Sequence, residues 1–334
     1  MKTRVLVIIV TYNSARHIVP CLESLKAQTF RDFTVHVWDN ASSDESARLL
    51  ASWGDSIHTT HLSPQNIGFC AANNRIIDST DSDYVLALNP DVILDAKFLE
   101  CIIGALEEDK KAGSATGKLW RQAPGVSASR IIDTTGIYFT PNQRHLDRGS
   151  GEIDSGQYDR REYVFGASGA AAVYRKAMLE DTRAGNQYFD EAFFAYREDA
   201  DLAWRAQWMG WCCLYVPEAV GFHVRKVLPE RRAALSQEIN MHSFKNRFLL
   251  RIKNMDAGTY LRYFLPITLR DLGALAYVLV REQSSLRAVP LIFRALPSAL
   301  KARKTLHNRH RAAPHAIRSW FSKRPSSRSV QPPS

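Results

Sequence analysis

The sequence VLVIIVTYN, residues 5–13, begins with six aliphatic side chains and turns polar at Thr11. Such an unbroken run, rich in β-branched residues, is typical of a strand buried on both faces, as in a parallel sheet. Apolar residues then recur at helical spacing from Ile18 to Leu25, so we expect a helix directly after the strand. The run is too short for the core of a signal peptide, and no small-residue cleavage site follows it.

The same order repeats through the first third of the chain. We expect strands at residues 33–38, 57–62 and 84–88, and helices through residue 50, within 66–77 and at 98–106. A further helix at 200–209 precedes a strand at 211–216. Strands that alternate with helices predict an α/β fold with a doubly wound, mostly parallel sheet flanked by helices.

Two other parts of the chain depart from this pattern. Residues 123–162 are rich in Gly, Ser, Asp, Arg and Thr, and we expect a long excursion of the functional or mobile kind. From about residue 244 to residue 300 the pattern predicts amphipathic helices. Residues 301–334 are basic and rich in Pro and Ser, so we expect partial disorder there.

The basic charge of the chain is concentrated near its C-terminal end. The net charge is +10, from 44 basic and 34 acidic residues, yet the last acidic residue is Glu282. Residues 283–334 hold 11 Lys and Arg, which leaves 33 basic against 34 acidic residues in the rest. A localised basic segment indicates contact with an anionic surface, either phospholipid or nucleic acid. The best apolar stretch, residues 272–280, is too short to cross a membrane but could lie on one.

The cysteines do not form a recognisable framework. There are five of them, an odd number, and no CxxC pair occurs. A zinc site or a set of disulfides needs other spacings. We therefore expect reduced, mostly buried thiols in a cytoplasmic protein.

Polar side chains follow three of the expected strands, at 11–13, 39–40 and 89–91. Each group alone is an ordinary turn sequence, but ligands of open α/β sheets bind at the carboxyl ends of the strands. Neither a GxGxxG fingerprint nor a P-loop is present to hold phosphates. A bound pyrophosphate would then need a divalent cation, Mg²⁺ or Mn²⁺, and Asp91 is placed to bind it.

A second polar group, Glu198-Asp199-Ala200-Asp201, opens the helix expected at 200–209. Acidic residues at a helix start also cap the helix and complement its dipole, which is the plain structural alternative. Aromatic residues at 193, 194 and 196 precede the group closely.

Taken in order, these stretches resemble family 2 glycosyltransferases of the GT-A fold, within the rhamnosyltransferase-like branch. The matching segments are VIIVTYNSARHIVPCLESL, VWDNASSDES, NIGFCAANN, LALNPD, FGASGAAAVYRKAML and FDEAFFAYREDADLAWR, with GFH further on. They span about two thirds of the chain. Each segment is modest alone, and the ordered set is specific.

The resemblance implies roles for individual residues on the donor side. It implies that the nucleotide-sugar site is formed by Thr11, Tyr12, Asn13, Asp39, Asn66, Asn73, Asn89 and Asp91. Asp39 would accept a hydrogen bond from the N3–H of uracil or thymine. Asn89 and Asp91 take the place of the family's DxD motif, with an amide where the first carboxylate is usual.

On the acceptor side, the resemblance implies that Asp199 is the general base, with Glu198 as the fallback. Inverting transfer needs one such base to deprotonate the acceptor hydroxyl. Gly166, Gly169 and Asp201 would border the acceptor, and His223 would be a second metal ligand beside Asp91.

These observations predict an inverting glycosyltransferase that adds a single sugar. The QxxRW motif of processive relatives is absent. The leading candidate donor is dTDP-rhamnose, with UDP-sugars as alternatives, and the expected acceptor is a glycan or polyprenyl-linked glycan of cell-surface polysaccharide. We expect a catalytic domain at 1–240, a membrane-surface helical extension at 241–300 and a basic tail at 301–334, on the inner face of the cell membrane.

Two other functions stay open at this point. A sugar-nucleotide nucleotidyltransferase would use a similar sheet, but residues 11–14 do not provide the Gly-rich, Arg-containing loop that it needs. A nucleic-acid-binding protein would explain the basic tail, yet no RRM, KH or zinc motif is present. We therefore expect no nucleic-acid partner.

Overall fold

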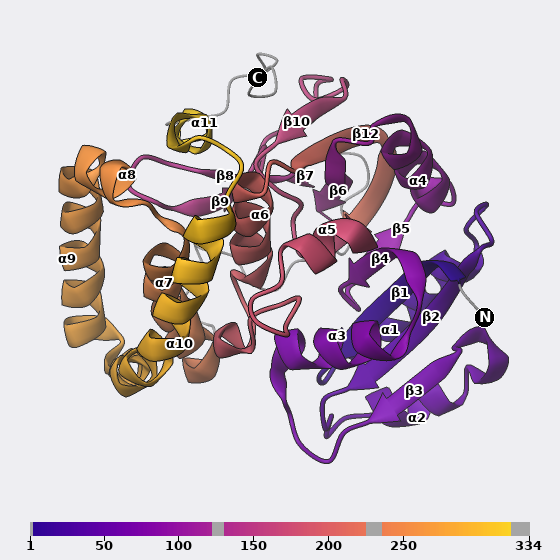
Figure 1. Cartoon of the computed structure of the whole chain (residues 1–334). Coiled ribbons are helices and arrows are strands. Elements are labelled where there is room, and N and C mark those ends of the chain that lie inside the picture. The colour runs from indigo at the N-terminus through magenta and orange to yellow at the C-terminus, as the bar shows by residue number, and fades with distance from the viewer. Residues whose placement is uncertain (1–2, 122–129, 225–235, 322–334) are drawn as a thin grey trace.

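The computed structural model describes residues 3–121, 130–224 and 236–321. Its centre is one mixed sheet in the order β10-β12-β6-β11-β4-β1-β2-β3, in which β4, β1, β2 and β3 are parallel. β5 and β7 pair with β12 and β6, and β8 and β9 form a separate hairpin. Figure 1 shows α1, α2 and α3 around the β1–β4 part of the sheet and α7, α9 and α10 on the other side of α6. The expected α/β class is confirmed.

The elements of the first half have these bounds: β1 Thr3–Thr11, α1 Ile18–Lys26, β2 Phe33–Asp39, α2 Ser46–Ala51, β3 Thr59–Leu62, α3 Gly68–Ser79, β4 Ser82–Leu88, β5 Val92–Leu94, α4 Phe98–Glu108 and β6 Ala112–Arg121. The second half contains β7 Ile132–Thr134, β8 Ile137–Phe139, β9 His145–Asp147, β10 Glu162–Val164, β11 Ala171–Arg175, α5 Lys176–Asp181, α6 Glu198–Trp208 and β12 Cys212–His223. The C-terminal helices are α7 Gln237–Asn254, α8 Ala257–Arg262, α9 Phe264–Arg281, α10 Ala288–Arg309 and α11 Pro314–Ser319.

The aliphatic run at the start of the chain forms the central strand β1. Residues Val5 to Ile9 are at most 1% exposed because β1 has β2 on one edge, β4 on the other, and helices over both faces. The predicted strand at 211–216 is longer than we expected, since β12 continues through a register shift to His223. The polar segment 123–162 contributes the short strands β7, β8 and β9, of which β7 pairs with β6 and β8 with β9.

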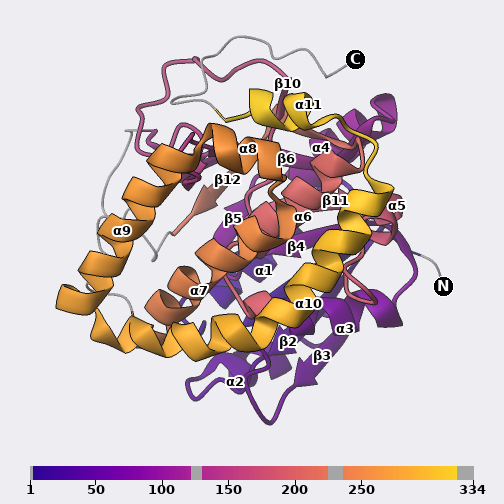
Figure 2. The same cartoon turned by 60° about the vertical axis from the view of Figure 1, so that its left-hand side comes forward.

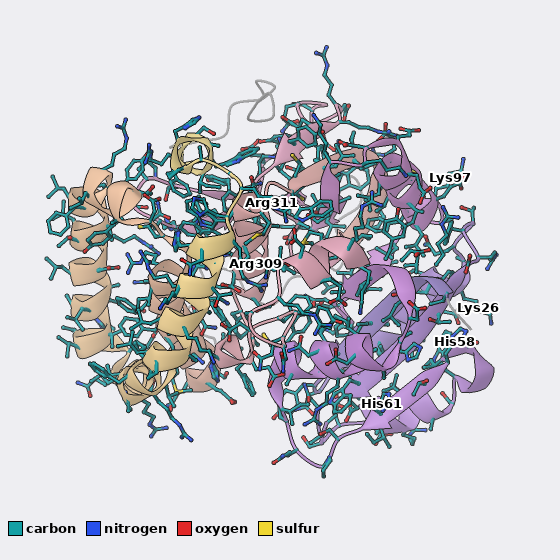
Figure 3. The ribbon with its side chains drawn as sticks, in the orientation of Figure 1. Lys26, His58, His61, Lys97, Arg309 and Arg311 are labelled. Atoms are coloured by element: carbon teal, nitrogen blue, oxygen red, sulfur yellow. The ribbon has the colours of Figure 1, made fainter. Side chains whose placement is uncertain are left out.

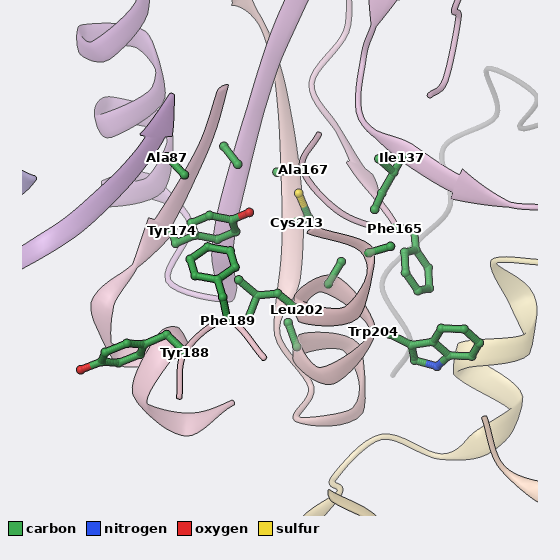
Figure 4. Packing of buried hydrophobic residues seen from close by; sticks show 14 of the residues in the cluster. Ala87, Ile137, Phe165, Ala167, Tyr174, Tyr188, Phe189, Leu202, Trp204 and Cys213 are labelled. Atoms are coloured by element: carbon green, nitrogen blue, oxygen red, sulfur yellow. The ribbon is translucent and has the colours of Figure 1, made fainter. Parts of the chain in front are cut away.

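Helix α6 is the central helix of the second half. All of its residues except Asp199 are buried, and Figure 4 shows Leu202 and Trp204 of this helix among Phe165 and Phe189. Burial on every side holds the start of α6, with its acidic residues, in a fixed position against the sheet.

The C-terminal helices are attached to this core rather than separate from it. Figure 2 shows α9 at the outer edge of the molecule, with α7 and α10 between it and the sheet. The boundaries that we placed at 240/241 and 300/301 fall inside α7 and α10. Arg309 and Arg311, labelled in Figure 3, pair with Asp181 at the end of α5.

The tail also begins as ordered structure. Phe321 is 5% exposed and packs against Phe139 and Trp204. Residues 322–334, where we expected disorder, lie outside the described residues. Within the described ranges, no helix has the length and apolar character needed to cross a bilayer.

Candidate active site

A cleft of about 1300 Å³ opens at the carboxyl ends of β1 and β4. One wall carries polar residues from the strand ends, and the other is made by the β8–β9 hairpin, the loop before α6, and helices α7 and α9. Of the predicted donor-site residues, those that line it are Tyr12, Asn66, Asn89 and Asp91. Glu198, Asp199, Gly169 and His223 line the same cleft. The structure therefore brings the two polar groups of the sequence together.

Thr11 and Asp39 lie below the cleft and do not line it. The Asp39 carboxylate is 3% exposed and accepts hydrogen bonds from the Thr11 hydroxyl at 2.8 Å, the Ser42 N–H at 2.9 Å and the Ser42 hydroxyl at 2.6 Å. Asn13, in a left-handed conformation with φ 52°, likewise accepts from the N–H of Ser43. These side chains shape the loop that follows β2. Asp39 Oδ1 accepts one of the three bonds and Oδ2 the other two, so Oδ1 keeps acceptor capacity for a further donor.

The two asparagines of the α3 region differ in position. Asn66 lines the cleft and accepts a hydrogen bond from the Gly68 N–H at 2.9 Å. Gly68 has φ +85°, and a Cβ there would lie 2.6 Å from the ring of Phe194, so only glycine fits. Asn73 is fully buried in α3, donates to the Phe69 carbonyl, and stands away from the cleft.

Asp91 and His223 face each other across the cleft floor. The nearest distance is 3.4 Å, between Asp91 Oδ1 and His223 Nε2, and the other ring nitrogen, Nδ1, donates to the buried carboxylate of Asp133 at 2.8 Å. Burial alone would lower the pKa of His223, but hydrogen bonding to Asp133 and Asp91 raises it to about 9. β5 pairs with β12 in antiparallel register, which sets Val92 opposite His223. Asp91, the residue before Val92, is thereby brought next to His223.

This pair fits a divalent cation that also takes oxygens from a ligand. Among the described residues, no three His, Cys, Asp or Glu side chains form a ready metal cluster. However, Mg²⁺ is commonly held by one or two protein ligands together with substrate phosphates. The Asp133 carboxylate fixes the orientation of the His223 ring in the way that partners of metal-bound histidines do.

Glu198 and Asp199 begin α6 side by side but have different surroundings. Asp199 Oδ2 accepts the Gly169 N–H at 3.0 Å, and His145 Nε2 approaches Asp199 Oδ1 to 4.0 Å. Glu198 is 9% exposed, and burial, followed by the neighbouring charge of Asp199, raises its pKa to about 8. A Cβ on Gly169 would lie 3.3 Å from Asp199 Oδ2, so the glycine leaves room for this carboxylate.

Gly166 and Asp201, expected beside the acceptor, do not line the cleft. Gly166 is buried, and a Cβ there would lie 2.3 Å from Ala203 on α6, so its role is close packing of α6. Asp201 is fully buried and accepts hydrogen bonds from Lys253 at 2.7 Å, Arg205 at 2.9 Å and Asn254 at 2.8 Å. Its carboxylate ties α6 to α7.

Several residues of the cleft were not singled out from the sequence. His145 comes from the polar segment, and four arginines line the second wall: Arg144, Arg197, Arg247 and Arg270. Asp133, from the same segment, does not line the cleft but contacts it through His223. No local motif marks these positions, because segments far apart in the chain bring them together.

The fold and the sequence were compared with known proteins. The structure of TarS 1-349 from S. aureus in complex with UDP-GlcNAc superposes with a TM-score of 0.55 at 16% identity, covering 96% of this chain and 93% of that one. The chain covers 55% of a longer TarS structure. GalNAc-T7 with UDP, GalNAc and Mn²⁺ gives a TM-score of 0.58 at 12% identity, covering 75% of this chain and 48% of that one. These likenesses show the GT-A fold.

Similarity in sequence is more specific. An N-acetylglucosaminyl-diphospho-decaprenol L-rhamnosyltransferase of Mycobacterium tuberculosis is 24% identical over 238 residues, which are 65% of this chain and 75% of that protein. The model of "Glycosyl transferase family 2" matches residues 6–183, more than half of the chain. The cleft at the strand ends thus lies in a protein of known class: the chain belongs to glycosyl transferase family 2.

Proposed function

We propose that the chain is an inverting, non-processive glycosyltransferase that transfers one sugar, L-rhamnose from dTDP-rhamnose as the leading candidate, to a lipid-linked glycan. The observation that carries this proposal is the single cleft that holds Asp91 and His223 on one side and Asp199 on the other. Such a site can hold a nucleotide diphosphate near a carboxylate that accepts the acceptor proton, which is what one-step transfer requires.

Asp199 is the better general base of the adjacent pair. The Glu198 carboxyl, with its pKa raised to about 8, keeps its proton through much of the neutral range, and a protonated carboxyl cannot accept another proton. Asp199 is oriented by the Gly169 N–H and is 12% exposed to the cleft.

The donor diphosphate is proposed to bind at Asp91 and His223 through Mg²⁺ or Mn²⁺, which would neutralise charge as the diphosphate leaves. The Asp133 carboxylate supports this by holding the proton on His223 Nδ1, so that Nε2 points at Asp91. Asn89 lines the cleft beside them and provides a neutral amide where the DxD motif has its first carboxylate. Two structures that resemble this fold contain Mn²⁺: GalNAc-T7 with UDP and GalNAc, and the mannosyltransferase PcManGT from Pyrobaculum calidifontis with GDP-Man.

The identity of the sugar and acceptor is proposed from the mycobacterial relative, whose name describes rhamnosyl transfer to a diphospho-decaprenol-linked sugar. A membrane-embedded acceptor agrees with the outer face of α8 and α9, where Leu261, Leu265, Leu269 and Leu272 are each at least 58% exposed. Together with the basic residues after Glu282, this face would hold the enzyme peripherally on the inner surface of the membrane.

A donor screen tests the function. Melting temperatures of the full chain are measured with dTDP- and UDP-sugars plus Mn²⁺, because a ligand that binds the native state raises them. We expect a rise with dTDP-rhamnose and Mn²⁺ that disappears in EDTA, and acceptor-dependent release of dTDP. Release of pyrophosphate from a nucleoside triphosphate would instead identify a nucleotidyltransferase.

A further inference from the structure

The second wall of the cleft carries a cluster of arginines that the donor site does not explain. Arg144, Arg197, Arg247 and Arg270 all line the cleft, from the β8–β9 turn, the residue before α6, α7 and α9 respectively. In Figure 1 the β8–β9 hairpin and α9 lie on the opposite side of α6 from β1–β4. Asp91 and the donor-side residues belong to that other wall.

The charges of this arginine cluster face one another. Burial lowers the pKa of Arg270 to about 8, and the next contributions, in decreasing order, come from the charges of Arg247, Arg197, Arg251 and Arg144. The charged groups that lower the pKa of Arg270 are thus all arginines. Arg270 Nη1 donates to the carbonyls of residues 142 and 143, which fixes its position without neutralising it. Two carboxylates, Asp147 of β9 and Glu238 of α7, line the same wall, so the four arginines leave it net positive rather than purely cationic. A net positive wall favours an anion of the substrate.

The arginine cluster lies next to the residues that would act on the acceptor. Arg197 directly precedes Glu198 in the chain, and His145, which follows Arg144, approaches Asp199 to 4.0 Å. An anion held by these arginines would therefore be close to the general base. This position fits a charged group near the acceptor hydroxyl better than the diphosphate of the donor at Asp91.

Helix α9 joins the arginine cluster to the apolar surface. Its inner face presents Ile267, Arg270, Ala274 and Val278, of which Arg270 and Ala274 line the cleft. Its outer face exposes Leu265, Leu269 and Leu272, at 65%, 62% and 58%. The arginine cluster and a surface suited to lipid thus lie on opposite faces of one helix, about 10 Å apart.

We propose that Arg144, Arg197, Arg247 and Arg270 bind the diphosphate of an acceptor that is carried on an apolar chain. Arginine forks pair with phosphate oxygens in two-point contacts, and the apolar chain would leave the cleft toward α8 and α9. This inference rests on the proposed function for the identity of the acceptor. It assigns a separate anion site, distinct from the cation-dependent site of the donor.

Binding of farnesyl diphosphate tests the site without requiring turnover. Calorimetric titration of the full chain is carried out in EDTA, so that no cation holds a diphosphate at Asp91, with farnesol as the uncharged control. We expect farnesyl diphosphate to bind, with at least tenfold weaker binding to Arg247→Gln and Arg270→Gln. Arg262→Gln, a change at an exposed position of α8 outside the cleft, should bind as the wild type does.

Further measurements separate the possible failures. Arg270 anchors the hairpin, so the melting temperature of each variant is recorded, and Arg247→Gln and Arg144→Gln decide the result if Arg270→Gln unfolds. Unchanged farnesyl diphosphate affinity in the folded variants overturns the proposal. Loss of dTDP and Mn²⁺ binding in the same variants, with farnesyl diphosphate binding unchanged, would assign the arginines to the donor and also overturn it. A chain that binds farnesyl diphosphate but transfers no sugar contradicts the proposed function and leaves the anion site standing.

Discussion

The exposed face of α9 leads to a quantitative prediction for membrane binding. Leu265, Leu269 and Leu272 are spaced four and three residues apart, so they share one face of the helix, and each is about 60% exposed. Full burial of a leucine is worth roughly 1.5–3 kcal/mol, so moving the exposed part into the membrane gives about 1–2 kcal/mol for each. Replacing all three with Gln should therefore cost about 3–5 kcal/mol, or roughly 10²–10⁴-fold in vesicle affinity.

Co-sedimentation with vesicles of mixed anionic and zwitterionic lipid measures this loss. Gln is a good helix former, so helicity measured by circular dichroism should stay unchanged. Leu62→Gln is a matched control, because Leu62 is 62% exposed at the end of β3 and lies outside both α9 and the cleft. Equal binding of wild type and the triple variant, or an equal loss in Leu62→Gln, would refute the assignment. If the face instead joins two copies of the chain, sedimentation velocity without lipid will show a dimer that the triple variant lacks.

Asp199→Asn should lower kcat by about 10²–10⁴-fold with donor affinity unchanged in calorimetry, since the amide cannot accept the acceptor proton. Asp91→Ala should abolish the Mn²⁺-dependent rise in melting temperature with the donor, and a variant that still responds to Mn²⁺ would exclude Asp91 as the ligand. The folded-state pKa of Glu198, raised to about 8, lies above the usual glutamate value of about 4.3. The unfolding free energy of the wild type therefore falls as pH rises between these two values. Glu198→Gln lacks this titration, so its melting temperature should rise relative to that of the wild type from pH 5 to pH 8. Asp201→Asn should lower the unfolding free energy by about 3–5 kcal/mol in denaturant titrations, because it removes the buried negative charge shared by Lys253 and Arg205 and leaves Lys253 with Asp190 as its carboxylate.

The sequence predicted the part of the site that lies at strand ends. Strand order is strongly constrained in α/β sheets, so the polar residues after β1 and β4 had to meet at one edge. Asn89 and Asp91 lie there as expected. Whether a side chain points into the cleft or below it depends on the turn that follows, and the bonds from Ser42 turn Asp39 inward.

Contacts between distant segments could not be predicted. Asp133 reaches His223 across 90 residues of sequence, and the arginine cluster combines four elements. Asp201 resembled a site residue because it follows Glu198 and Asp199. On a helix it points about 200° away from Asp199, toward Lys253 of α7, a partner that the sequence pattern does not identify.

Anomeric configuration, followed by NMR in a single reaction mixture, tests the proposed transfer most directly. The wild-type chain is incubated with dTDP-rhamnose, Mn²⁺ and a short lipid-diphosphate-linked sugar, and the anomeric proton of the transferred sugar is recorded from the first turnovers. We expect a product of opposite anomeric configuration to the donor that forms only with acceptor and is absent with Asp199→Asn. A product that retains the donor configuration, or one that Asp199→Asn forms at the wild-type rate, would contradict direct displacement with Asp199 as the base.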